Sequence, residues 1–234
     1  MKQKSRPLMS IKTIALHGSP YVGIFCSTTD EIALVPGNTL SKEQKRIQDT
    51  LSVEAIPCTI AESHLIGVLA RGLHKKFAVA YTATQDEIDT LHEYGVRAER
   101  VPEVTAIGNL FCIQKKGGIV SPLLPRETMK WLEKYFNIPL HQKGVAQTEL
   151  SGSCVLATEK GFLAHPKTAP EEMEFLESIF GAAGMTTTAN YGDPFIANSI
   201  IANQHGIIVG ERTSGPELAR IDEGLHPGLI TRQG

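Results

Sequence analysis

The residues of this 234-residue chain that could carry nucleophilic or metal chemistry are four cysteines and eight histidines. A nucleophilic cysteine needs a cationic neighbour that lowers the pKa of its thiol, and a zinc site needs closely spaced ligands. The sequence contains no C-x-x-C, H-E-x-x-H or phosphate-loop motif, and no two histidines have ligand spacing. We therefore predict no catalytic residue, no metal site and no cofactor. We expect buried thiols of a reducing compartment at Cys26, Cys58, Cys112 and Cys154.

Composition and charge narrow the class of protein further. The chain is 41% hydrophobic and 21% charged, with a net charge of −2. This balance argues against a protein that coats nucleic acid, since such binding relies on many Lys and Arg residues that release counterions. No apolar run approaches the roughly 20 residues of a membrane span, and no apolar region of a secretory signal follows the basic N-terminus. We expect a cytoplasmic protein that makes no membrane contact.

Binding residues are suggested by a set of small residues that recurs along the chain every 41 to 45 positions. These anchors are Gly23, Gly67, Gly108, Gly152 and Ala197. The residue after each anchor differs from module to module: Ile24, Val68, Asn109, Ser153 and Asn198. These positions could simply pack against different neighbours, but Asn is disfavoured in strands. We therefore favour a binding role for Asn109 and Asn198.

The elements that must position these residues also repeat. Twenty-four residues after each anchor comes the middle member of a helix-face pattern with i, i+3, i+7 spacing. These middle residues are Ile47, Leu91, Leu132, Leu176 and Ile221. A period in the forties indicates a propeller, solenoid or array. Each module is predicted to run strand, strand, helix, strand; the first has strands at residues 22–27, 32–35 and 53–60 and a helix at 41–51. Capping boxes are expected at Thr84/Glu87 and Ser214/Glu217.

The fifth module lacks a third strand, whereas a spare strand is predicted at residues 11–16. We expect this strand to complete the fifth module and close a ring, giving a five-fold pseudosymmetric α/β-propeller of the pentein type. A four-stranded β-propeller is the competing fold, but the helical pattern in every module argues against it. The predicted single domain spans 11–225 between tails at 1–10 and 226–234, with modules at 21–64, 65–105, 106–148, 149–193 and 194–225.

Several motifs resemble the translation initiation factor 6 family, the ribosome anti-association factors. The fourth module carries Gly161-Phe162-Leu163-Ala164-His165-Pro166-Lys167-Thr168 followed by Glu171-Glu172, and the third carries Ala106-Ile107-Gly108-Asn109. The closing stretch, residues 202–206, 209–210 and 213–218, is most similar to the archaeal branch. The resemblance covers residues 20–225 in register. The long tail of the eukaryotic members has no counterpart here.

The resemblance implies a non-enzymatic monomer that binds the large ribosomal subunit at its intersubunit surface. It would prevent premature association with the small subunit and take part in large-subunit maturation. The implied partner is a ribosomal protein near the sarcin–ricin loop, with minor rRNA contact. The ribosome-contact residues expected on the modules are Val68, Asn109, Ser153, Cys154, Phe195 and Asn198, with the turn of Gly72, His74 and Lys75 beside them. Val68 departs from eukaryotic members, which have a basic residue there.

Two alternatives remain. Pentein enzymes that modify guanidines, as hydrolases or amidinotransferases, use a nucleophilic cysteine close to the C-terminus. The last cysteine of this chain is Cys154, and the fifth module has none. The other alternative is a disc that binds proteins unrelated to the ribosome.

Overall fold

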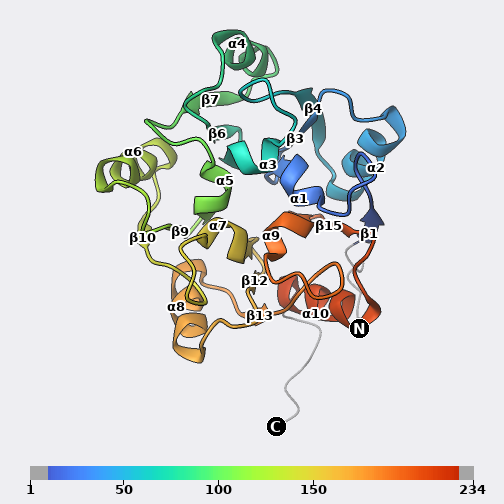
Figure 1. The fold of residues 1–234 in the computed structure, drawn as a ribbon, viewed down its shortest axis with the longest axis vertical. Coiled ribbons are helices and arrows are strands. Elements are labelled where there is room, and N and C mark those ends of the chain that lie inside the picture. Colours follow the sequence, from blue (N-terminus) through green and yellow to red (C-terminus); the bar gives the residue numbers. More distant parts are fainter. Residues whose placement is uncertain (1–9, 227–234) are drawn as a thin grey trace, which may run out of the picture.

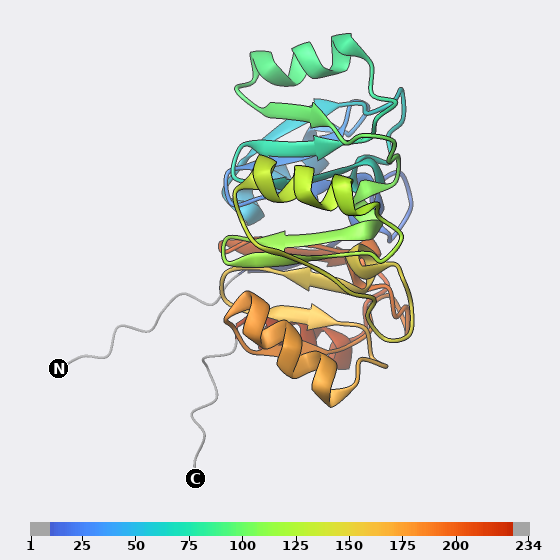
Figure 2. The same ribbon diagram turned by 90° about the vertical axis from the view of Figure 1, so that its left-hand side faces the viewer.

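The computed structural model describes residues 10–226, which form a mixed α/β structure of small three-stranded sheets. Figure 1 shows five such sheets around a centre, with a long helix outside each and a short helix inside each. Figure 2 shows the same molecule from the side, where it is narrower and the strands run across the narrow dimension.

Every sheet has the same topology. The middle strands, β3 (Ile32–Pro36), β6 (Lys76–Val79), β9 (Gly117–Val120), β12 (Phe162–Ala164) and β15 (Gly206–Gly210), pair on both sides. Their antiparallel neighbours are the inner strands β2 (Ser27–Thr28), β5 (Ala70–Leu73), β8 (Phe111–Gln114), β11 (Val155–Ala157) and β14 (Ile200–Ala202). Their parallel neighbours are the outer strands β4 (Glu54–Cys58), β7 (Arg97–Arg100), β10 (Leu140–Gln142), β13 (Gly184–Thr186) and β1 (Ser10–Ile14).

The outer strand of the fifth sheet comes from the other end of the chain. Strand β1 runs parallel to β15, with Ser10 opposite Gly206 and Ile14 opposite Gly210. Figure 1 shows the two strands side by side, β1 in dark blue and β15 in red. This pairing confirms that the N-terminal strand completes the last module, although the strand ends at Ile14 rather than at residue 16. Of the tails predicted at 1–10 and 226–234, residues 1–9 and 227–234 lie outside the described residues, whereas Ser10 belongs to β1 rather than to a tail.

The long helices follow the predicted apolar pattern. They are α2 (Ser41–Leu51), α4 (Gln85–Glu93), α6 (Arg126–Phe136), α8 (Pro170–Phe180) and α10 (Gly215–Leu225). The predicted stripe residues Ile47, Leu91, Leu132, Leu176 and Ile221 are all buried. Five apolar clusters form the core, and each combines residues from the sheets of two adjacent modules with residues of one long helix. Burial of one helix face is what fixes these helices, as expected for amphipathic segments.

The start of each module differs from the prediction. A one-turn helix takes the place of the first half of the predicted first strand: α1 (Val22–Phe25), α3 (Ile66–Leu69), α5 (Ile107–Leu110), α7 (Ser151–Cys154) and α9 (Ile196–Ser199). The prediction of a strand from Val22 was therefore wrong, because contacts with neighbouring modules decide the backbone here and override local strand preference. Four residues are also too few to show a helical period in the sequence.

No helix in residues 10–226 combines the length and the apolar character that crossing a bilayer requires.

Candidate functional site

The five short helices form a closed ring around the centre of the molecule. Each contacts the next in chain order, and α9 contacts α1. The anchors lie at these contacts: a Cβ atom added to Gly67 would overlap the carbonyl oxygen of Gly23, and one added to Gly108 would overlap that of Gly67. The anchor glycine therefore recurs because a side chain would push adjacent helices apart. The ring is a rigid platform for the residues that it carries.

One surface of this ring, which we call the short-helix face, consists of the short helices and the residue that precedes each of them. The preceding residues are apolar: Tyr21, Leu65, Ala106, Leu150 and Phe195. Tyr21 and Leu65 are 39% and 42% exposed, and nearby Tyr191 is 81% exposed. Exposed apolar side chains next to two helices in contact, α1 and α3, are suited to a protein–protein contact.

Asn109 and Asn198 are half-buried on this face, in α5 and α9. Their backbone amides donate within the short helices, to the carbonyls of Ala106 (3.1 Å) and Phe195 (2.9 Å). No hydrogen bond to either side-chain amide is present within residues 10–226, and neither amide is sealed from solvent. Two amide groups with free donors and acceptors therefore lie among apolar neighbours, as in the polar positions of an interface.

Other predicted contact residues lie beneath the surface. Ser153 and Cys154 are 3% and 0% exposed, so α7 turns both side chains into the protein. Val68 is half-buried and packs against the apolar cluster of the second module. Phe195 is half-buried and lies edge-on to the His165 ring, with ring centroids 5.7 Å apart. Ser153 and Cys154 can support the face but do not present side chains to a partner.

The turn of Gly72, His74 and Lys75 does not lie beside the short-helix face, contrary to our expectation. Strand β5 leads away from α3 and carries the chain about 10 Å before the turn. Gly72 is buried, and a Cβ atom there would lie 2.5 Å from the Phe77 ring, so packing explains this glycine. His74 and Lys75 are exposed at the opposite end of the inner strands.

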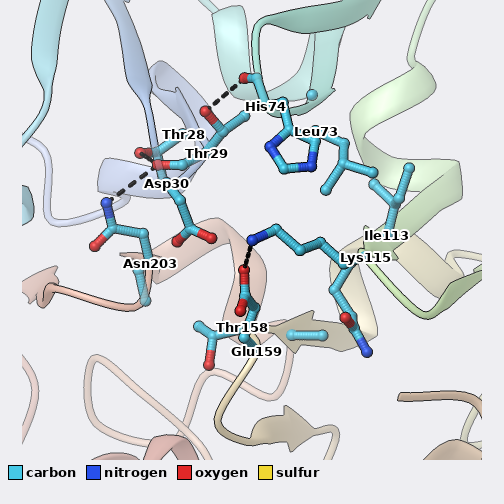
Figure 3. A pocket seen from close by; sticks show the side chains of 14 residues that line it. Thr28, Thr29, Asp30, Leu73, His74, Ile113, Lys115, Thr158, Glu159 and Asn203 are labelled. Carbon is cyan, nitrogen blue, oxygen red and sulfur yellow. Dashed lines mark hydrogen bonds and ion pairs between the residues drawn. The ribbon is translucent and has the colours of Figure 1, made fainter. Parts of the chain in front are cut away.

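The opposite end, which we call the hairpin-turn end, holds a polar pocket of about 50 Å³ lined by the hairpin turns of all five modules. Figure 3 shows Lys115 extending between Asp30 and Glu159, with His74 above. Thr29 Oγ1 donates to the His74 carbonyl at 2.8 Å, and Gln204 N donates to Asp30 Oδ1 at 2.9 Å. The hydrogen bond of Thr29 links the first module to the second, and that of Gln204 links the fifth module to the first. The pocket therefore joins modules together.

Electrostatics in this pocket follow from the same contacts. Lys115 forms an ion pair with Glu159 and lowers the pKa of that carboxyl group. Burial, together with the neighbouring Glu159 carboxyl, raises the pKa of Asp30. Structural ion-pair networks perturb pKa values just as active sites do. We interpret these two shifts as those of a charge network that holds modules together.

The thiols offer no nucleophile in the described structure. Cys26, Cys58, Cys112 and Cys154 are all buried, as predicted, and none forms a disulfide. Burial raises the pKa of Cys112 and of Cys154 to about 11 and that of Cys58 to about 12, and it raises the pKa of Cys26 still further. The thiols are therefore neutral near pH 7, whereas nucleophilic cysteines are thiolates. Within residues 10–226 no group of Cys, His, Asp and Glu could hold a metal ion.

Sequence reasoning missed the residues that position the short helices. The loop before α3 contains Ala61 and Glu62 in the left-handed region (φ 55° and 58°), which non-glycine residues rarely adopt. Glu87 of α4 holds this loop, because its carboxylate accepts from Ala61 N at 2.8 Å and from Glu62 N at 2.9 Å. The capping box with Thr84, where Thr84 N donates to Glu87 at 2.9 Å, is confirmed.

The same device recurs in two other modules. Glu172 of α8 accepts from Ala146 N, in the loop before α7. Glu217 of α10 accepts from Tyr191 N and Gly192 N, in the loop before α9. For Glu87 and Glu217 the sequence shows only the capping pattern, because the loop lies 25 to 26 residues earlier. For Glu172 it shows not even that pattern, since Ala169 occupies the N-cap position.

Comparison with known proteins gives a consistent result. The model of the eIF-6 family matches residues 11–224. A protein of Pyrococcus abyssi named translation initiation factor 6 is 33% identical over 229 residues, which cover 95% of this chain and all of that protein. Proteins with the same name from Staphylothermus marinus and Natronomonas pharaonis are 34% identical over 228 residues and 37% identical over 213. These alignments cover 95% and 90% of this chain, and 100% and 96% of those proteins.

Proposed function

Because this chain belongs to the eIF-6 family, with a role in translation initiation, we propose that it binds the large ribosomal subunit at the intersubunit surface. Bound there, it sterically prevents premature association with the small subunit and takes part in large-subunit maturation. The relatives are named as initiation factors rather than enzymes, and the neutral thiols also favour a binding role. The proposed partner places the protein in the cytoplasm.

The observation that carries this proposal is the short-helix face. It combines exposed apolar side chains with the unpaired amides of Asn109 and Asn198 on a closed ring of helices. An apolar centre with few, well-placed polar groups suits a protein partner, and the net charge of −2 does not suit an extended RNA surface. We therefore propose a large-subunit ribosomal protein near the sarcin–ricin loop as the main contact, with rRNA contributing little.

The proposed contact set follows from where the structure puts each residue. Val68, Asn109, Phe195 and Asn198 would meet the partner, while Ser153 and Cys154 would support them from below. The turn of Gly72, His74 and Lys75 would face away from the subunit.

A protein that acts by steric exclusion needs a rigid structure and a high affinity for its partner, and it needs no catalytic residues. We assign the ring to the pentein fold and treat residues 11–225 as one domain that acts as a monomer. The repeated sheet topology and the contact between α9 and α1 support this assignment. Occupancy of large subunits present at about 1 µM requires a Kd well below that value. The corresponding free energy of binding is about −10 kcal/mol or more favourable.

Sedimentation with purified large subunits tests the proposal. We expect the wild-type protein to migrate with the subunit, and Asn109→Asp to weaken binding, because a half-buried carboxylate would replace a neutral amide. Lys75→Ala, an exposed change at the hairpin-turn end, is the matched control and should bind normally. A wild-type protein that stays at the top of the gradient refutes ribosome binding. Equal binding by Asn109→Asp and loss with Lys75→Ala would instead place the contact at the hairpin-turn end.

A further inference from the structure

Arg71 of β5 is a half-buried cation near the centre of the ring, and its Nε is the end that lies away from solvent. Its Nη2 donates to the carbonyl oxygen of Gly108 at 2.6 Å. Its Nε has no exposed surface and no hydrogen-bond partner in residues 10–226. An unsatisfied buried donor costs about 1–3 kcal/mol, and more when the group is charged, so this atom needs a partner.

The charge of Arg71 also lacks a counter-charge. Arg71 belongs to none of the ion pairs of residues 10–226, which include His74 with Glu31, Lys115 with Glu159 and His226 with Asp222. Burial lowers the pKa of Arg71, but a guanidinium stays protonated in proteins. The Cys112 thiol lies near enough to interact electrostatically, yet burial keeps it neutral by raising its pKa to about 11. Buried charges are normally paired.

A small cavity of about 30 Å³ adjoins Arg71 on the axis of the ring. The thiols of Cys26 and Cys112, which are weak hydrogen-bond donors, line it together with Gly23 and Gly72. This volume is sufficient for at least one water-sized ligand. A one-atom anion fits such a space. A water molecule could satisfy Nε but would leave the charge unbalanced.

We propose that this cavity binds a single halide ion, chloride in the cell, which accepts from Arg71 Nε and balances its charge. The ion reaches the cavity from the hairpin-turn end, because the cavity and the polar pocket there share lining residues: Thr28, Gly72, Ile113, Ala157 and Ala202. Through Arg71 and the Gly108 carbonyl, the bound ion ties β5 of the second module to α5 of the third. The halide therefore stabilises the ring next to Asn109.

Unfolding in matched salts tests this proposal. Wild type and variants are compared in about 1 M sodium chloride and the same concentration of sodium gluconate, whose anion is too large for the cavity. For a Kd of about 0.1 M, chloride should raise the folding equilibrium constant about tenfold. Arg71→Met should lose this difference between the salts. Arg46→Met, which removes an exposed cation and so matches the change in net charge, should keep it.

Crystals of the wild-type protein grown in bromide give an independent readout, which does not depend on whether Arg71→Met folds. We expect an anomalous peak within hydrogen-bond distance of Arg71 Nε. The proposal is overturned if the cavity holds only water in bromide. It is equally overturned if Arg71→Met and wild type respond alike to chloride.

Discussion

Replacing Glu217 with Gln should destabilise the protein strongly and in a pH-dependent way. The Glu217 carboxylate accepts from Thr188 Oγ1 at 2.7 Å, Ser214 N at 2.7 Å and Gly192 N at 2.9 Å. Burial alone would raise the pKa of this carboxyl group, but these hydrogen bonds outweigh it and lower the pKa from 4.5 to about 2. Glutamine keeps one acceptor oxygen and turns an NH₂ group towards donors, so it cannot replace the carboxylate.

The magnitude follows from the pKa. Each unit by which the pKa differs between the folded and the unfolded protein corresponds to about 1.36 kcal/mol. The ionised carboxylate therefore contributes up to about 3 kcal/mol to the free energy of unfolding. Because the pKa is lower in the folded protein, this contribution is complete above pH 4.5 and is lost as the pH falls towards 2. We expect Glu217→Gln to lower the free energy of unfolding by about 2–3 kcal/mol at pH 7 and by progressively less below pH 4.5.

Urea unfolding of wild type and Glu217→Gln at a series of pH values between 7 and about 2 measures this difference. Exposed Glu211, changed to Gln, is the control and should leave stability within about 0.5 kcal/mol of wild type. A loss below about 0.5 kcal/mol at pH 7, or a loss that does not shrink in acid, would show that the loop before α9 is not held by the charge of Glu217.

Two further predictions concern ring closure. Gly67→Ala should lower the free energy of unfolding in urea by about 3 kcal/mol or more, since its Cβ atom would overlap the Gly23 backbone. Gly215→Ala, where a Cβ atom meets open space, is the control. Equal stability of the two variants would contradict the close approach of α1 and α3. Deleting residues 1–16 removes β1 and should unfold the fifth module, seen as lost amide protection in β14 and β15; an unchanged melting curve would refute the structural need for this strand.

The long helices and the register of the modules could be predicted because a buried helix face imposes a period that the sequence displays. Ile47 and Leu132 lie on buried faces for this reason. The short helices could not be predicted, since what fixes them is the contact of Gly23 with Ala197 from the far end of the chain. A strand-like run such as residues 22–25 carries no local sign of that contact.

The site was predictable to a similar extent. The anchors led to Asn109 and Asn198, because residues that vary between equivalent positions are visible in a repeat. The exposure of the residues at these equivalent positions could not be predicted. Ser153 and Cys154 were therefore expected at the surface, although they are buried. Side-chain direction inside a one-turn helix depends on how the ring packs. Arg71 gave no signal either, because its missing counter-charge is a property of the whole interior.

Subunit joining tests the central claim most directly. Purified large and small subunits are mixed with and without a saturating amount of the protein, and the joined fraction is read from a density gradient. We predict that the wild-type protein reduces the joined fraction and that the double variant Asn109→Asp, Asn198→Asp does so far less, while Lys75→Ala acts as wild type. A joined fraction that saturating wild-type protein leaves unchanged would contradict the account.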